Sequence, residues 1–153
     1  MNPLDQRNHY IKEFVSAFTT QYPKSDETVL TFIATFLTAA GTDQTEVIQK
    51  TFRAGYCYYF ALMLHDAFPD GEICWAAPFG HIVYVKDKIP YDIEGVYEGE
   101  AEMFIPVKRL GEAINDFRHI EGVSYNITDQ EIAQIMLEWK KRCQYCVSFF
   151  FSK

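Results

Sequence analysis

The chain has 153 residues, of which 48% are hydrophobic and 23% are charged, and this composition suits a single globular domain with a sizeable core. Its 13 phenylalanines and 10 tyrosines exclude a disordered protein. The net charge of −7 repels phosphate backbones, so nucleic acid is not an expected partner.

The N-terminal residues are polar and form no apolar run, and no stretch approaches the ~18 apolar residues of a membrane span. The sequence therefore predicts no signal peptide, no membrane partner and a cytoplasmic protein, with export by a dedicated system as the alternative. In the cytoplasm, Cys57, Cys74, Cys143 and Cys146 are expected to be reduced.

Residues 1–70 are predicted to be helical. Apolar residues at helical spacing predict a first helix over residues 9–20, which Pro23 ends. Ser25 is the expected N-cap of a second helix, and Gly41 is expected to stop it. The predicted buried stripe of this helix comprises Val29, Phe32, Ile33, Phe36 and Leu37.

Asp43 and Glu46 form a capping-box pattern, which predicts a third helix that runs towards Gly55. A fourth helix is predicted over residues 57–67, and the sequence at 69–71 is a strong turn signal. The predicted core face of this helix comprises Phe60, Ala61, Leu64 and Phe68.

Residues 72–105 change to the period of a sheet. Strands are predicted over 72–77, 81–86 and 89–96, with Asp87-Lys88 as the loop of a hairpin. Phe104-Ile105 is expected to add a further short strand.

Residues 106–153 are predicted to hold helices and one strand. Pro106 is expected to open a helix to about residue 117, a strand follows at 123–127, and a capping box at 128–131 opens a long C-terminal helix. The chain as a whole, residues 1–153, is therefore predicted to be one α+β domain, with N-terminal helices packed on a small central antiparallel sheet.

Cys57 stands where a segment ending in glycine turns into the fourth predicted helix. The first amide groups of a helix have no partners within the helix, and with the helix dipole they favour a thiolate and a developing oxyanion. A thiol nucleophile at Cys57 is therefore one interpretation, and a small buried structural residue is the other.

His81 and Asp92 fall on neighbouring predicted strands. If Asp87-Lys88 is a two-residue loop, Lys86 pairs with Ile89, and His81 and Asp92 become diagonal neighbours on one face of the sheet. The opposite face is apolar, with Ile82, Tyr84, Tyr91 and Ile93. In this register Glu94 lies directly opposite His81, so Glu94 competes with Asp92 for contact with the imidazole. A structural histidine is the alternative interpretation.

Three short motifs carry a resemblance to a known family: Gly55-Tyr56-Cys57 with Phe60-Ala61 and Leu64, Gly80-His81-Ile82-Val83, and Tyr91-Asp92-Ile93 with Gly95. Over roughly residues 53–97, the chain resembles the papain-like cysteine peptidase superfamily in its broad sense. The nearest branches in style are transglutaminase-like, arylamine acetyltransferase-like and small bacterial cysteine peptidase-like. The resemblance implies a papain-like core with Cys57 as nucleophile, His81 as general base and acid, and Asp92 as orienter.

Relatives of this kind often use an upstream glutamine as a second oxyanion donor. Gln49, Gln44 and Tyr56 are the alternatives in this sequence. The candidate substrate-binding residues are Tyr56, Trp75 and Phe79, which flank the proposed site in sequence. Tyr97 flanks it too, and core packing is the alternative for each of these aromatic residues.

These observations predict a cysteine-dependent hydrolase or acyl transferase that acts on an amide or thioester carbonyl of a peptide, protein or small molecule. Hydrolysis, deamidation and acyl transfer remain open. A catalytically silent binding or regulatory module of the same fold is the alternative. No cofactor or metal is expected, because the spacing of Cys143 and Cys146 favours packing over a zinc or redox site. The apolar run Phe149-Phe150-Phe151 is expected to dock on the core or on a second copy, which would form a homo-oligomer.

Overall fold

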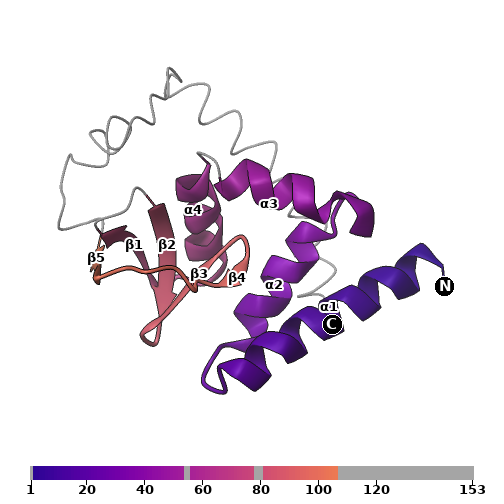
Figure 1. The fold of residues 1–153 in the computed structure, drawn as a ribbon, viewed down its shortest axis with the longest axis horizontal. Helices are drawn as coiled ribbons and strands as arrows, with labels where there is room; N and C mark the ends of the chain where they lie inside the picture. Colours follow the sequence, from indigo (N-terminus) through magenta and orange to yellow (C-terminus); the bar gives the residue numbers. More distant parts are fainter. Residues whose placement is uncertain (1, 54–55, 78–80, 107–153) are drawn as a thin grey trace.

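A computed structural model describes residues 2–53, 56–77 and 81–106. These residues form an α+β fold (Figure 1), as predicted. In chain order the helices are α1 (Pro3–Gln21), α2 (Glu27–Leu37), the 3₁₀ turn η1 (Thr42–Gln44), α3 (Thr45–Arg53) and α4 (Cys57–Ala67). The strands are β1 (Glu72–Ala77), β2 (His81–Lys86), β3 (Ile89–Asp92), β4 (Gly95–Val96) and β5 (Met103–Pro106).

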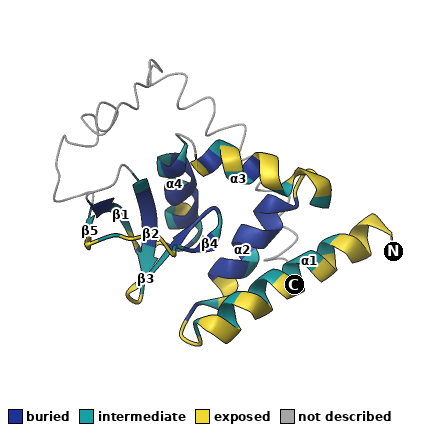
Figure 2. Cartoon of the chain, viewed as in Figure 1, coloured by how far each residue is buried: buried dark blue, intermediate teal, exposed yellow. Residues whose placement is uncertain are grey.

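Helix α1 begins at Pro3, earlier than the predicted start near His9. The Asn2 side chain caps the helix by accepting a hydrogen bond of 2.8 Å from the Asp5 amide, and Pro3 occupies the first helical position, where its fixed φ suits the helix. None of the side chains of α1 is fully buried (Figure 2). The helix lies against the rest of the molecule through half-buried aromatic residues, including Phe14 and Phe18.

The N-cap of α2 is Asp26, so the prediction of Ser25 was wrong by one residue. The Asp26 carboxylate accepts hydrogen bonds from the amides of Thr28 and Val29 at 2.8 and 3.2 Å. The Ser25 hydroxyl instead donates to the Tyr22 carbonyl at 2.6 Å, in the turn that follows α1. The predicted stripe of α2 is confirmed as core, and the helix is buried over much of its circumference.

Helix α2 ends at Leu37, before the predicted stop at Gly41. Gly41 has a φ of 108°, in the region that favours glycine, and opens the η1 turn. The third helix therefore starts at Thr45, after this turn, and the predicted capping box from Asp43 to Glu46 does not begin it. Short 3₁₀ turns of this kind commonly precede an α-helix.

The sheet has the order β4-β3-β2-β1-β5, and every neighbouring pair is antiparallel. The hairpin between β2 and β3 has the predicted two-residue loop, because Lys86 pairs with Ile89 and Tyr84 with Tyr91. Asp87 and Lys88 both have positive φ, 49° and 69°, which is the conformation of a type I′ turn.

The third predicted strand, over residues 89–96, is wrong as a single strand. The chain turns at residues 93–94 and returns as β4, which pairs Asp92 with Gly95 and Tyr91 with Val96. Gly95 has a φ of 114°, and a Cβ atom there would lie 2.4 Å from the Phe18 ring. Only glycine satisfies both conditions, so this residue lets the chain reverse beneath α1.

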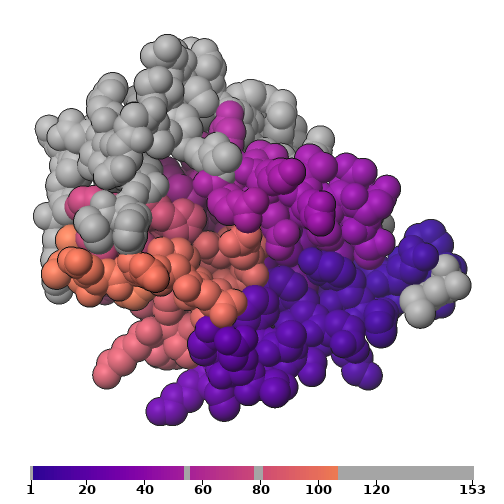
Figure 3. All heavy atoms as spheres, in the orientation of Figure 1, coloured from indigo at the N-terminus to yellow at the C-terminus, as the bar shows by residue number. Residues whose placement is uncertain are grey.

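The two faces of the sheet are covered differently. On one face, Ile82, Tyr84, Tyr91 and Ile93 are buried in the main core with the buried sides of α2 and α4, which are dark blue in Figure 2. On the other face, Cys74, Ala76 and Val83 are buried beneath Val85, Tyr97, Ala101 and Phe104. Because β4 and β5 lie at opposite edges, residues 97–102 cross this second face to join them, as Figures 1 and 3 show.

Pro106 is the last residue of β5 and the last of the described residues. The predicted helix to residue 117, the strand at 123–127 and the C-terminal helix lie outside the described residues, as do Cys143, Cys146 and Phe149–Phe151. Within the part of the chain that the structure describes, no helix combines the length and apolar character needed to cross a membrane.

Candidate functional site

Cys57 is the first residue of α4, as predicted, and is nearly buried, with 6% of its surface exposed. The helix starts here because the carbonyl of Tyr56, the N-cap residue, accepts hydrogen bonds from the amides of Tyr59 and Phe60 at 3.1 and 3.3 Å. The Cys57 amide is the first of the helix, so it has no acceptor within the helix. The thiol therefore lies in the positive field of a helix N-terminus.

His81 is the first residue of β2, and α4 packs on this strand. The imidazole contacts two chemically active side chains. Its Nε2 atom lies 2.9 Å from Oδ2 of Asp92, and the Cys57 side chain lies close enough to the ring to raise its pKa. Because Asp92 occupies Nε2, Nδ1 is the ring nitrogen that remains for the thiol. The structure thus brings Cys57, His81 and Asp92 together in the predicted order.

Asp92 ends β3 and is 7% exposed. Its two carboxylate oxygens have different partners: Oδ2 faces His81, and Oδ1 accepts a hydrogen bond of 2.8 Å from the amide of Glu94. The Glu94 side chain forms an ion pair with Arg53 at the end of α3. The sequence left Asp92 and Glu94 as alternative partners of the imidazole. Asp92 makes the contact, because the turn at 93–94 directs Glu94 towards Arg53.

The environment of His81 favours its protonated form. Burial of the ring lowers its pKa, but the hydrogen bonds and negative charges of Asp92 and Cys57 more than offset this effect and raise the pKa to about 9. At neutral pH the ring is therefore an imidazolium.

Sequence reasoning did not find the link between Arg53 and Glu94. These residues are 41 positions apart, and nothing in their local sequences indicates a contact. The ion pair joins the end of α3, shortly before Cys57, to the turn whose amide holds Asp92. It therefore connects the segment that carries the thiol with the segment that carries the carboxylate.

Tyr97 is a second neighbour whose position the sequence did not define. It follows β4 directly, and its ring stacks on the imidazole of His81 with a centroid distance of 5.3 Å and an interplanar angle of 27°. The sequence placed Tyr97 near the site but gave no reason to prefer it over other flanking aromatic residues.

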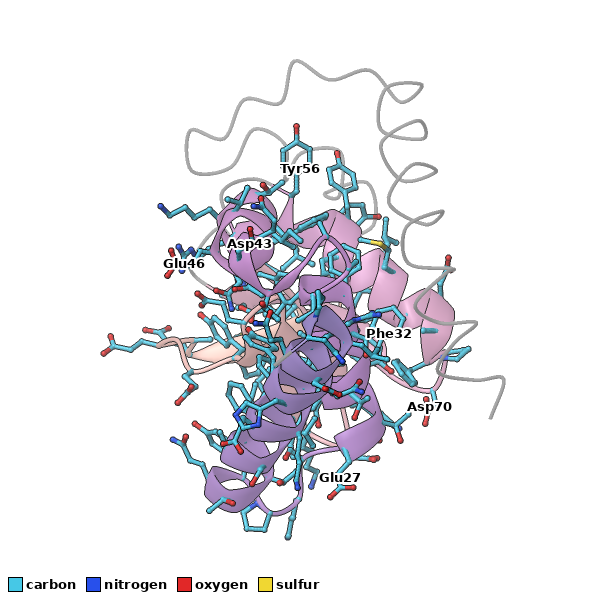
Figure 4. All side chains as sticks on the ribbon, turned by 90° about the vertical axis from the view of Figure 1, so that its right-hand side faces the viewer. Glu27, Phe32, Asp43, Glu46, Tyr56 and Asp70 are labelled. Carbon is cyan, nitrogen blue, oxygen red and sulfur yellow. The ribbon has the colours of Figure 1, made fainter. Side chains whose placement is uncertain are left out.

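The three predicted substrate-binding residues have different surroundings. Tyr56 precedes the thiol, packs its ring against Tyr59 at 5.5 Å, and lies at the opposite end of the molecule from Glu27 (Figure 4). Trp75 pairs with Ile82, so it lies on the helix-covered face, whereas His81 pairs with Ala76 on the other face. Phe79 lies outside the described residues.

The predicted second oxyanion donors are not equivalent. Gln44 is exposed in η1, where its amide donates to Asp43 at 3.5 Å, so this side chain is engaged away from the thiol. Gln49 is half-buried in α3, and Tyr56 is adjacent to Cys57. The assignment of a second donor to either of these residues stays a prediction.

Other features of the described residues do not add to this cluster. No group of three or more histidine, cysteine, aspartate or glutamate side chains in the described ranges is arranged to hold a metal ion. A cavity of about 610 Å³ lies at the start of α1, and its lining, which includes Arg7, Thr38 and Asp43, contains no residue of the cluster.

The described residues thus define an α+β protein with a Cys–His–Asp cluster at the N-terminus of a helix. Comparison with protein-family models gives one match, to a family described as phage YunG-like protein, over residues 36–140. The chain belongs to this family. The matched region includes Cys57, His81 and Asp92, and leaves α1 outside. No curated protein and no solved structure shows significant similarity to the chain.

Proposed function

We propose that this protein is a cysteine-dependent hydrolase or acyl transferase that acts on an amide or thioester carbonyl, with a papain-like core. The observation that carries the proposal is the position of His81 between two reactive side chains: its Nε2 atom bonds Asp92, and the Cys57 side chain interacts with the same ring. A nucleophile, a base and an orienter in contact form the arrangement that thiol catalysis requires.

In the proposed first step, the Cys57 thiolate attacks the carbonyl carbon and a carbon–sulfur bond forms. The Cys57 amide at the start of α4 donates to the resulting oxyanion. The imidazolium of His81 then gives its proton to the departing amine or thiol as the bond to this group breaks, which leaves an acyl-enzyme and a neutral imidazole.

In the second step, His81 takes a proton from water or from an acceptor amine as that molecule attacks the thioester. The carbon–sulfur bond breaks, the acyl group leaves as a carboxylic acid or an amide, and Cys57 and His81 return to their starting states. Asp92 keeps the imidazole edge directed at the sulfur throughout and stabilises the imidazolium.

Brief treatment with iodoacetamide near neutral pH, followed by peptide mapping, tests whether the thiol is activated. Cys57 should be alkylated before every other cysteine. Cys74 is the matched control within the same protein, because it is also nearly buried, at 3% exposed, but lies within a strand. Preferential labelling of Cys74, Cys143 or Cys146, with Cys57 inert, would show that Cys57 is a structural residue.

Variants divide the roles within the cluster. His81→Ala should slow labelling of Cys57 by roughly tenfold or more, because the imidazolium partner is lost. Asp92→Asn should slow it less, because it only loosens the orientation of the ring. Glu94→Gln is the control for a nearby carboxylate, and we expect the smallest change, because its side chain contacts Arg53.

Turnover of p-nitrophenyl acetate separates catalysis from a reactive but silent site. The enzyme should show a burst of p-nitrophenol, an acetyl group on Cys57 by peptide mass, and slow steady release. A protein that is alkylated at Cys57 but never acetylated there would instead be the silent binding module.

A further inference from the structure

Tyr97 lies over the flat face of the His81 ring, and several contacts fix it there. Its ring stacks on His81 at 5.3 Å, and Phe104 of β5 meets it edge-on, with centroids 6.1 Å apart at 84°. Its backbone amide donates to the Pro90 carbonyl at 2.8 Å. Three contacts therefore fix the position of Tyr97: its backbone hydrogen bond to Pro90, the Phe104 ring and the His81 ring.

Gly99 completes this arrangement. A Cβ atom at this position would lie 2.2 Å from the Tyr97 hydroxyl oxygen and 2.3 Å from Cζ, distances that real Cβ contacts do not reach. The backbone at Gly99 thus touches the phenol end of Tyr97, and any larger residue must displace the ring. A substitution at Gly99 can therefore displace Tyr97 indirectly. An added methyl group would move the Tyr97 ring without altering the side chains of Cys57, His81 and Asp92.

The hydrogen bond of His81 to Asp92 acts at the edge of the ring, so it controls rotation within the ring plane better than tilt out of it. The Tyr97 ring, stacked against the face of the imidazole at an interplanar angle of 27°, restricts the tilt. The negative face of an aromatic ring also attracts a cation within about 6 Å of its centroid, so it favours the imidazolium.

We propose that Tyr97 is a positioning residue for His81, which holds the imidazole plane between Cys57 and Asp92 and favours its charged form through its aromatic face. This inference rests on the proposed function and adds a fourth residue to it. The ring, and not the hydroxyl group, supplies the effect. Burial and the charge of Asp92 raise the pKa of Tyr97, so the phenol stays neutral throughout the range in which His81 titrates.

The ionisable groups around His81 come from several elements. Cys57 approaches from α4 and Asp92 from β3, and the Arg53–Glu94 pair lies behind Asp92. On β1 the direct neighbour is Ala76, and Cys74, which pairs with Val83, lies two pairs further along. On the second face the described aromatic neighbours, Tyr97 and Phe104, carry no charge at neutral pH.

The test is the pH profile of Cys57 alkylation by iodoacetamide, measured from pH 5 to pH 10 on the full chain. Tyr97→Leu keeps bulk but removes the aromatic face, Tyr97→Phe restores the face without the hydroxyl, and Gly99→Ala displaces the ring. Gly71→Ala is the matched control, because a Cβ atom there would lie 2.3 Å from the Tyr84 ring, in the main core and not beside His81.

We expect Tyr97→Leu and Gly99→Ala to lower the labelling rate at pH 7 by roughly threefold to tenfold, and to move the acid limb of the profile upward by about 0.5–1 pH unit. Tyr97→Phe should recover most of the wild-type rate. Gly71→Ala should lower the melting temperature and leave the profile in place. A purely structural tyrosine would lower the melting temperature in the same way and would not move the acid limb.

Two other outcomes have distinct meanings. If Tyr97→Leu and Gly99→Ala give the wild-type profile while His81→Ala shifts it, Tyr97 is only a packing residue and the proposed function stands. If His81→Ala also gives the wild-type profile, the cluster does not activate Cys57, and both the proposed function and the role of Tyr97 are wrong.

Discussion

Two carboxylates close to one histidine have separate tasks in this protein. Asp92 is almost buried, and its carboxylate forms one hydrogen bond with His81 and one with the Glu94 amide. Glu94 is about half exposed at its side chain and pairs with Arg53. Exposed ion pairs contribute only about 0–1 kcal/mol to stability. The Arg53–Glu94 pair therefore affects the position of the turn at residues 93–94 more than the stability of the fold.

The raised pKa of His81 predicts how stability depends on pH. The folded-state pKa of about 9 exceeds the unfolded value near 6.5, so protonation of His81 stabilises the fold. This contribution is fully present below about pH 6.5 and is lost as the pH rises through about 9. The free energy of unfolding from urea titrations should therefore fall across this window, by up to about 3 kcal/mol.

The control for this prediction is His81→Gln, which should flatten the decline between pH 6.5 and 9. Cys57→Ala should flatten it in part, because one of the two side chains that hold the proton is removed. An equally steep decline in His81→Gln would show that another group produces it.

At the scale of elements, the β2–β3 hairpin sets the relation between His81 and Asp92. Its two loop residues both have left-handed backbones, yet neither is glycine or asparagine. The strand pairing requires this type I′ turn, although Asp87 and Lys88 adopt left-handed backbone conformations at a cost in free energy. At the end of β2, next to this loop, the Lys86 ammonium contacts Asp26 at 2.5 Å.

Replacing Asp87-Lys88 by Asn-Gly should stabilise the protein by on the order of 1 kcal/mol, because this pair is preferred in type I′ turns. The midpoint of urea unfolding should rise, while the rate of Cys57 alkylation should not change. The control Lys88→Ala keeps a side chain at a positive φ and should give no gain. If Asn-Gly lowers the midpoint, the loop residues contribute contacts beyond their backbone conformation.

Local chemistry explains which elements the sequence could predict. The polar pair Asp87-Lys88 between two apolar runs defined the register, and with it the proximity of His81 and Asp92. The predicted strand over residues 89–96 missed the reversal after Asp92, because the apolar residues of this segment fit the pattern of one strand. Gly95 was the one local signal of a turn. The Arg53–Glu94 pair and the stacking of Tyr97 depend on tertiary packing between segments far apart in sequence, so no local pattern could reveal them.

On the scale of the whole molecule, the core extends beyond the region that defines the family. The family match begins at Phe36, within α2, but Val29, Leu30, Phe32 and Ile33 of the same helix are buried in the main core. The start of α2 also holds the hairpin, because the Asp26 amide donates to the Tyr91 hydroxyl at 2.7 Å. Helix α1, in contrast, buries no side chain fully.

Two truncations test this division. A chain that starts at Tyr22 should still unfold cooperatively, at a lower temperature, because it loses only half-buried contacts. A chain that starts at Phe36 should show no cooperative transition, because burying each missing core side chain is worth about 1.5–3 kcal/mol, against a total stability of about 5–15 kcal/mol. Calorimetry of the two truncated chains checks this, and a cooperative transition in the shorter one would place the stabilising core elsewhere.

The order of α4, β1, β2 and β3 along the chain has a consequence for folding. Cys57, His81 and Asp92 come from α4, β2 and β3, with only β1 between the first two, and the hairpin between the last two closes a loop of only two residues. Short closures lose little chain entropy, and local contacts form fast. We therefore expect these elements to assemble as one early folding unit, with α1 docking on it later. Under the proposed function, the chain would then acquire its reactive thiol before α1 has docked.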